Sequence, residues 1–351
     1  MPGGRIPLLL LVLLVLLACT GTWLFPAFNC QPREEKDLLS FYEYDKSKPL
    51  NPRLAPIKQT GNYTLYKLYF SSVKGEVIPA LFATPRNVKG PYPCVLLVHG
   101  LGGSKEIYLD VIDLLSKNGF ASLAIDLPSH GERGRRRMEP GEVLLVVAQA
   151  VFDLRRALDY LESRGDIDGV GVMGKSLGGI ISSILAGVDD RVKALVIVSS
   201  GGNWTLITSG LREGEKKLAL KALKKLGRYV EPLNYISRYK GPAQFHHGLR
   251  DTVIPPEACM QLYEAAGGPK EIYWYDAGHG VKFNEVMDKV LPFLKKNLVK
   301  QQPLTPSNRE GKLTTLLTVI AVCTCVIAVL AVYLLRRKRS VNPPSPPPPS
   351  F

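Results

Sequence analysis

The sequence predicts an α/β fold built on one mostly parallel sheet. Short apolar runs of strand length alternate with amphipathic segments of helical length between about residues 61 and 298. Several of these runs are continuously apolar, which is typical of strands that are buried on both faces. No internal repeat or low-complexity linker divides the region. Such alternation predicts a sheet covered by helices, with functional side chains at the carboxyl ends of the strands.

The predicted elements follow one another in a regular order. Residues 31–60 are polar and contain prolines, and they predict an N-terminal arm with one short helix. TLYKLYF and EVIPALFATP flank a turn at residues 71–75 and predict a β-hairpin. The later strands are expected at CVLLVHG, ASLAIDLP, GVGVMG, ALVIVSS, AQFHHG and EIYWYD, and the helices at KEIYLDVIDLLSKNG, residues 141–162, the segment after Ser176, PPEACMQLYEAAG and VKFNEVMDKVLPFLKKNL.

Ser176 lies in the segment VGVMGKSLGG, between a predicted strand and a predicted helix. Gly174 and Gly178 flank it in a G-x-S-x-G pattern, which in this context is typical of a nucleophile on a sharp turn. The glycines lack the Cβ atoms that would clash in such a turn. The alternative is an ordinary serine at the start of a glycine-rich helix, and the preceding strand favours the nucleophile.

A base and an acid are expected in the loops after the last two strands. His279 follows the final strand in YDAGHG, and Asp251 follows the strand before it in HHGLRDTVIPPE. A serine hydroxyl needs a base, and an acid orients that base. The chain order of serine, aspartate and histidine fits the same pattern. His246 and His247 are expected to shape the acid loop, and Asp276 is interpreted as a turn residue.

Two backbone N–H groups are predicted to stabilise an oxyanion. One belongs to Leu177, directly after the nucleophile, and the other to Leu101 in the turn HGLGG. The alternative for that turn is an ordinary glycine turn. Lys175 is interpreted as a charge at the mouth of the pocket. No cysteine or histidine spacing indicates a metal site, and no cofactor is expected.

The segments HGLGGSKE, DLPSHGERG, GKSLGG, HGLRDTVIP and GHG resemble the successive signatures of the α/β-hydrolase superfamily. The resemblance covers about residues 64–298 and is greatest to dienelactone-hydrolase-like esterases and prolyl-oligopeptidase-like serine hydrolases. It implies an α/β-hydrolase fold, a triad of Ser176, Asp251 and His279, and oxyanion donors at Leu101 and Leu177.

Two departures limit what the resemblance implies. Dienelactone hydrolases use a cysteine nucleophile, and prolyl oligopeptidases carry a propeller domain that the short arm cannot form. A carboxylic ester hydrolase with a small-molecule or lipid-like acyl ester substrate is therefore expected. The alternatives are a serine peptidase or amidase with the same triad, and a non-catalytic binding module on the same fold.

Residues 201–240 form a candidate cap segment within the hydrolase domain (61–300). Its central helix is predicted to be amphipathic. The apolar positions are Leu218, Ala219, Ala222, Leu223 and Leu226, and the opposite positions are Lys217, Lys221, Lys224 and Lys225. One interpretation is a surface helix that packs on the sheet, and the other is a lid that contacts lipid head groups.

The two ends of the chain predict attachment to a membrane. Residues 1–28 read as a signal peptide or an N-terminal anchor, and residues 313–335 contain no charge and are long enough for a transmembrane helix. Residues 336–351 begin with RRKR and end in a proline-rich tail. The positive-inside rule predicts that this tail is cytoplasmic and the catalytic domain extracytoplasmic. Two N-x-T sequons agree with export.

The net charge of +14 comes from 45 basic and 31 acidic residues. No nucleic-acid motif accompanies it, so no nucleic-acid partner is expected. Part of the charge is in the basic loop from Arg133 to Arg137, whose role the sequence leaves open, as it does the oligomeric state.

Overall fold

The computed structural model describes residues 32–134, 138–299, 318–320, 324 and 331. The chain divides into two units, Met1–Val299 and Lys300–Phe351. The predicted N-terminal segment (1–28) and tail (336–351) lie outside the described residues, as does all but a few residues of the predicted transmembrane segment (313–335). None of the helices that the structure describes combines the length and apolarity needed to cross a membrane.

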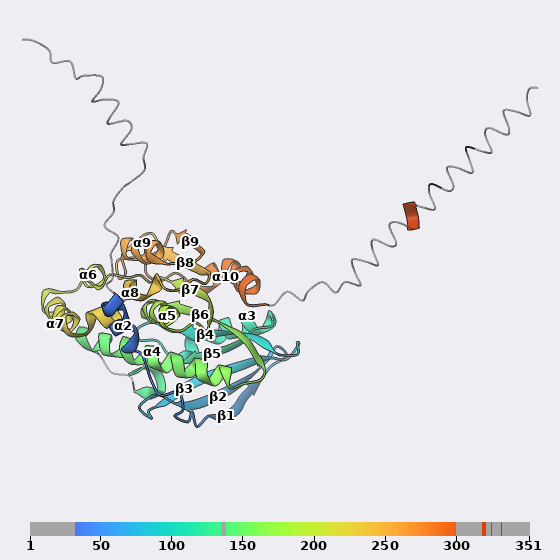
Figure 1. Ribbon diagram of the computed structural model, residues 1–351, viewed down its shortest axis with the longest axis horizontal. Helices are drawn as coiled ribbons and strands as arrows, with labels where there is room; N and C mark the ends of the chain where they lie inside the picture. The colour runs from blue at the N-terminus through green and yellow to red at the C-terminus, as the bar shows by residue number, and fades with distance from the viewer. Residues whose placement is uncertain (1–31, 135–137, 300–317, 321–323, 325–330, 332–351) are drawn as a thin grey trace, which may run out of the picture. The chain divides into compact units, whose positions relative to one another are not determined.

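In the described part of the first unit, nine strands form one sheet in the order β1-β2-β3-β5-β4-β6-β7-β8-β9 (Figure 1). The strands are β1 (Arg53–Gln59), β2 (Tyr63–Ser71), β3 (Val77–Pro85), β4 (Tyr92–Val98), β5 (Ala121–Ile125), β6 (Ile167–Lys175), β7 (Val192–Val198), β8 (Ala243–Gly248) and β9 (Lys270–Tyr275). The pairs β1–β2, β2–β3 and β3–β5 are antiparallel, and the pairs β5–β4, β4–β6, β6–β7, β7–β8 and β8–β9 are parallel. The prediction of a mostly parallel sheet is confirmed.

Helices cover both faces of this sheet. They are α2 (Pro32–Ser40), α3 (Leu109–Lys117), α4 (Pro140–Glu162), α5 (Leu177–Val188), α6 (Trp204–Ile207), α7 (Glu213–Val230), α8 (Leu233–Ile236), α9 (Pro256–Ala265) and α10 (Phe283–Leu298). In β4, Leu96 and Val98 contribute to the core under α4 and α5, whereas Val95 and Leu97 contribute to the core under α3 and α10. β4 is continuously apolar because both faces of the sheet are buried at this strand.

The arm contains a strand that the sequence pattern does not predict. β1 pairs antiparallel with β2 at the edge of the sheet, and all seven of its side chains are exposed. No face of β1 is buried, so its sequence carries no alternating apolar signal. Pro56 lies within it, which an edge strand tolerates because one side of the strand needs no ladder hydrogen bonds.

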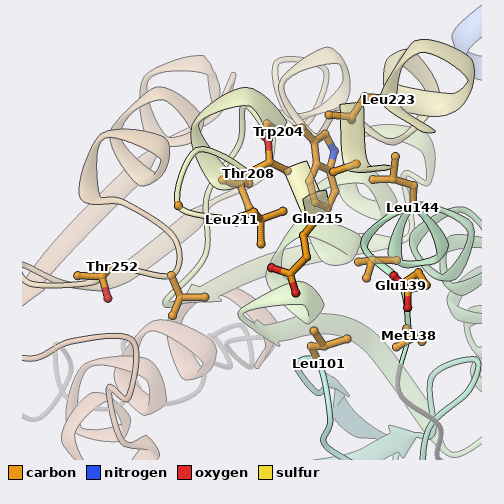
Figure 2. Close-up of a pocket in the computed structure, with 15 residues that line it drawn as sticks. Leu101, Met138, Glu139, Leu144, Trp204, Thr208, Leu211, Glu215, Leu223 and Thr252 are labelled. Atoms are coloured by element: carbon orange, nitrogen blue, oxygen red, sulfur yellow. The ribbon is translucent and has the colours of Figure 1, made fainter. Parts of the chain in front are cut away.

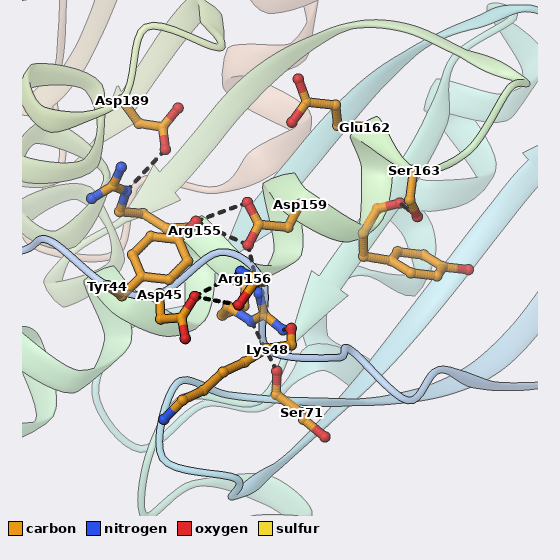
Figure 3. A network of polar contacts seen from close by, with 12 residues as sticks. Tyr44, Asp45, Lys48, Ser71, Arg155, Arg156, Asp159, Glu162, Ser163 and Asp189 are labelled. Carbon is orange, nitrogen blue, oxygen red and sulfur yellow. Dashed lines mark hydrogen bonds and ion pairs between the residues drawn. The ribbon is translucent and has the colours of Figure 1, made fainter.

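Two arginines of α4 attach the arm to the body of the unit (Figure 3). Arg155 donates a 2.6 Å hydrogen bond from Nη1 to the carbonyl oxygen of Tyr42, and Arg156 donates a 2.7 Å bond from Nη2 to that of Lys48. The Tyr44 hydroxyl donates to Asp159 on the same helix. Because these bonds satisfy main-chain carbonyls of an irregular segment, they order the arm without requiring regular structure.

The candidate cap consists of α6, α7 and α8. α7 packs against α4, where a Cβ built on Gly141 would lie only 3.1 Å from the Cβ of Ala222. All four lysines predicted for its outer face are exposed. Leu218, however, is 47% exposed, so its assignment to the buried face is wrong. α7 packs on the helix α4 rather than on the sheet. A helix covers a narrower strip of its neighbour than a sheet does, so Leu218, at the margin of the apolar face, stays exposed.

Candidate active site

Ser176 occupies a strained turn between β6 and α5. Its φ of 55° and ψ of −122° lie in a region that costs about 1–3 kcal/mol for a residue with a Cβ. The turn is held by a 2.8 Å hydrogen bond from the Ser176 N–H to the carbonyl oxygen of Val198, and by a 2.7 Å bond from the Ser200 hydroxyl to the Ser176 carbonyl oxygen. The surrounding structure therefore holds a conformation that the residue would not adopt by itself.

The flanking glycines of the G-x-S-x-G pattern are required by close backbone contacts. A Cβ at Gly174 would lie 2.3 Å from the carbonyl oxygen of Gly178, and a Cβ at Gly178 would lie 2.0 Å from that of Val98. Both distances are far below van der Waals contact, and the atoms met are backbone atoms. The steric reason proposed from the sequence therefore applies here: the start of α5 lies too close to β4 and β6 for a Cβ at either glycine.

The structure brings Ser176, His279 and Asp251 into one hydrogen-bonded chain. The Ser176 Oγ lies 2.8 Å from Nε2 of His279, and Nδ1 of His279 lies 2.8 Å from Oδ2 of Asp251. Since the carboxylate can only accept, the histidine carries its proton on Nδ1 and its Nε2 accepts from the serine hydroxyl. The three residues come from the ends of β6, β8 and β9, which the parallel sheet places at one edge.

Asp251 is held in its charged form. Its Oδ1 accepts 2.9 Å hydrogen bonds from the N–H groups of Val253 and Ile254. Burial alone raises the pKa of Asp251, but these bonds and the one from His279 outweigh it and keep the pKa below its usual value. The carboxylate is therefore available to orient the imidazole and to stabilise its protonated form.

The neighbouring histidines differ from each other in role. His247 follows the prediction, because its Nε2 lies 3.0 Å from the carbonyl oxygen of Ile254 in the acid loop. The prediction for His246 is wrong: its ring nitrogens lie within hydrogen-bond distance of the Tyr275 hydroxyl and Gln244 instead. Successive residues of a strand point to opposite faces, so the two cannot share one loop. Asp276 pairs with Arg250 at the surface.

The turn after β4 presents Leu101 beside the serine. A Cβ at the preceding residue, Gly100, would lie 3.0 Å from the Ser176 Cβ. The N–H of Gly102 donates to Nε2 of His130, and that of Gly103 donates to the Gly100 carbonyl oxygen. Among the described residues, no backbone acceptor is found for the N–H group of Leu101, so this group can donate to a ligand.

Leu177 offers a second N–H group at the same serine. It is the first residue of α5, and the N–H of a first helical residue has no intrahelical acceptor. The predicted donors therefore lie beside Ser176, Leu101 in the turn after β4 and Leu177 at the start of α5. Their role as oxyanion donors stays a prediction.

Sequence reasoning did not identify the residues that hold the donor turn. His99 lies within 2.8 Å of the Gly100 carbonyl oxygen through Nδ1, and its Nε2 accepts from the Leu127 N–H. Burial lowers the pKa of His99 to about 4, so the ring is neutral, as both bonds require. His99 and His130 stand in the segments HGLGG and DLPSHG, but the sequence does not show that these two loops are in contact, and the fold does.

A buried ion pair joins the same two loops. Lys105 is 1% exposed and Asp126 is 0% exposed, and the Nζ–Oδ2 distance is 2.7 Å. Glu106 and Glu132 also lie within 2.8 Å of the Lys105 ammonium. Burial by itself lowers the pKa of Lys105, but the three carboxylates raise it well above its usual value. The ammonium therefore stays charged and ties the donor turn to the loop after β5.

Lys175 does not present its charge at a pocket mouth, so that interpretation is wrong. Its Nζ donates a 2.9 Å hydrogen bond to the carbonyl oxygen of Val281 and lies 5.1 Å from the ring centre of Phe283. Both contacts are just beyond His279 in the chain. The side chain folds back because it can satisfy its ammonium on this loop, and it thereby holds the loop that carries the histidine.

A pocket of about 390 Å³ lies between the cap and the loops that carry Leu101 and Asp251 (Figure 2). Leu101 borders it on one side, and Thr252 and Val253, directly after Asp251, border it on another. The cap contributes Trp204, Ile207, Thr208, Gly210, Leu211, Glu215, Ala219 and Leu223, and the start of α4 and the residues before it contribute Met138, Glu139, Val143 and Leu144. The lining is largely apolar, and volumes of this order accommodate small ligands.

Two family models match the chain. Residues 93–223 match the model described as alpha/beta hydrolase fold, and residues 28–144 match the model described as acetyl xylan esterase. The first match includes the strained serine turn. The chain belongs to the α/β-hydrolase superfamily. The resemblance found from its motifs is thereby confirmed.

This α/β hydrolase is similar to curated bacterial proteins. It is 25% identical to the esterase YjfP of Escherichia coli over 239 residues, which cover 63% of this chain and 96% of the esterase. It is 30% identical over 207 residues to an uncharacterized protein of Mycobacterium tuberculosis, covering 54% and 50% of the two chains. The hydrolase thus spans about half the length of that relative.

Solved structures share the fold. Acetyl xylan esterase 1 from Thermoanaerobacterium sp. JW/SL YS485 aligns with a TM-score of 0.66 at 21% identity, over 76% of this hydrolase and 94% of that chain. The acetyl xylan esterase from Paenibacillus sp. R4 gives a TM-score of 0.63 at 21% identity, over 75% and 93% of the two chains. At these identities the similarity establishes the fold alone.

Proposed function

We propose that this α/β hydrolase is a serine esterase that cleaves small-molecule or lipid-like acyl esters through an acyl-enzyme. The observation that carries the proposal is the continuous hydrogen-bonded chain from the Ser176 hydroxyl through His279 to Asp251. Its similarity to esterases favours an ester over an amide substrate. A peptidase or amidase would use the same three residues.

The proposed reaction follows from the positions of the protons. The Ser176 Oγ attacks the ester carbonyl carbon while His279 Nε2 takes the hydroxyl proton. The carbonyl oxygen becomes an oxyanion, which the Leu101 and Leu177 N–H groups stabilise. As the C–O bond to the alcohol breaks, His279 returns the proton to the leaving oxygen. Water then attacks the acyl-enzyme with the same histidine as base, which releases the acid and restores the serine.

The proposal also includes the attachment of this catalytic unit to a membrane. Residues 313–335 are uncharged and are followed by RRKR, which supports a C-terminal anchor with a cytoplasmic tail. The catalytic unit would then act outside the cytoplasm. Alkaline carbonate extraction of membranes tests the anchor, because release of the full chain into the soluble fraction would contradict it.

The test of the chemistry is covalent labelling. A fluorophosphonate probe should label the full chain at Ser176, and Ser176→Ala should abolish labelling and p-nitrophenyl acetate hydrolysis. Ser209→Ala is a matched control, because that hydroxyl donates to the Leu206 carbonyl oxygen in the cap and lies outside the triad. Labelling that persists in Ser176→Ala would overturn the assignment. Faster cleavage of aminoacyl anilides than of p-nitrophenyl esters would favour the peptidase or amidase.

A further inference from the structure

The pocket beside the triad combines an apolar lining with negative charge. Among its 15 described lining residues, the charged ones are the two carboxylates Glu139 and Glu215, although the chain as a whole carries a net charge of +14. The carboxylate of Glu139 caps the start of α4 by accepting from the backbone N–H of Glu142. Its charge is therefore already used by the helix.

Glu215 has no such use. No hydrogen bond or ion pair connects its carboxylate to another residue of the described chain. It lies in the first turn of α7, where an acid also favours the helix dipole, but Glu213 in the same turn already serves that purpose and is exposed. Residues two positions apart on a helix face nearly opposite sides, so Glu215 points inward where Glu213 points to solvent.

Figure 2 shows the Glu215 carboxylate directed into the pocket, between Leu211 and the candidate donor residue Leu101. The carboxylate is partly exposed and lies among Leu211, Ala219 and Leu223, and no cation is found among the described residues that line the pocket. Partial removal from water strengthens its attraction to any cation that enters and its repulsion of any anion. A cationic group in this pocket is therefore favoured over an anionic one.

We propose that Glu215 determines specificity, and that the preferred substrates are esters whose pocket-bound part is apolar and carries a cationic amine or quaternary ammonium group. The inference rests on the proposed esterase function, because it concerns the substrate of the same triad. Trp204 contributes an aromatic side chain to the same lining. Apolar contacts in the pocket bind the alkyl part of the ester, and Glu215 favours a cationic ester over a neutral one of the same shape.

The experiment compares two esters that differ only in charge. Butyrylthiocholine and 3,3-dimethylbutyl thiobutyrate have the same shape, with a quaternary nitrogen in the first and a carbon in the second. The ratio of their kcat/KM values is measured on the full chain through the released thiol. Because both values come from one preparation, any loss of folded protein cancels in the ratio.

We expect the unaltered protein to favour the cationic ester by about tenfold, the size of one partly desolvated ion pair. Glu215→Gln should reduce the ratio to about one. Glu213→Gln removes the same charge from the same helical turn outside the pocket and should leave the ratio unchanged. In 1 M NaCl the preference should shrink, because salt screens partly exposed charges.

Two failures are distinguishable. If both esters are hydrolysed in a Ser176-dependent manner but the ratio is near one, or if Glu215→Gln does not change it, the specificity inference is overturned and the esterase function stands. If neither ester is hydrolysed and Ser176 does not react with a fluorophosphonate, the proposed function falls and the inference falls with it.

Discussion

Replacing Lys105 by methionine tests whether the buried ion pair holds the donor turn. Methionine approximates the length and the apolar stem of lysine but removes the ammonium, so packing is largely kept. The substitution leaves Asp126 fully buried without its cation, and Glu106 and Glu132 lose a partner at the surface.

The expected cost can be worked out from the contacts. Breaking a buried ion pair on one side costs about 3–5 kcal/mol, because the remaining charge is left uncompensated. Asp126 keeps two backbone donors, the N–H groups of Lys105 and Glu132, at 2.9 Å each. These offset part of the loss and favour the lower end, about 3 kcal/mol. For a unit of this size that lowers the melting temperature by roughly 6–12 °C.

The assay is urea denaturation of the full chain at pH 7, with the melting temperature as a second measurement. Lys117→Met is the matched control, since Lys117 forms an exposed pair with Asp113 and should cost less than about 0.5 kcal/mol. Adding Asp126→Asn to Lys105→Met should recover only part of the loss, because no charge then remains buried but the amide replaces one of the two acceptor oxygens by a donor. A loss no larger than that of the control would refute the reasoning.

Three further outcomes are expected. Gly178→Ala forces a Cβ to within 2.0 Å of a backbone oxygen and should cost about 3 kcal/mol or more in urea unfolding, whereas Gly214→Ala, with nothing within 4 Å, should be neutral or stabilising. Lys175→Met frees the Val281 carbonyl and should lower kcat for p-nitrophenyl acetate about tenfold, with partial rescue by Lys175→Arg. Burial lowers the pKa of His246 to about 3, whereas the unfolded chain binds that proton near pH 6.5. Stability should therefore fall as pH drops below 6.5, and His246→Gln should reduce the slope of urea stability against pH by about 1.4 kcal/mol per unit; an unchanged slope would contradict this.

The site could be predicted from the sequence as far as it depends on chain order. Strand ends in a parallel sheet converge on one edge, so the residues after consecutive strands become neighbours even when they are distant in the chain. Ser176 and His279 are 103 positions apart, yet their side chains lie 2.8 Å from each other. The need for glycine on both sides of Ser176 could also be predicted, because it arises from close contacts around one short turn and appears as one short sequence pattern.

The sequence alone thus predicted a mostly parallel sheet, eight of its nine strands in chain order and the three residues that follow strand ends. Tertiary structure decided which charges meet and which faces are covered. Lys105 and Asp126 are 21 positions apart without a shared motif, and β1 leaves no apolar pattern because nothing covers it. The roles of Lys175 and Glu215 depend on the directions of their side chains, which the fold sets. Such contacts arise from the packing of loops and a cap against each other, and local sequence periodicity does not encode that packing.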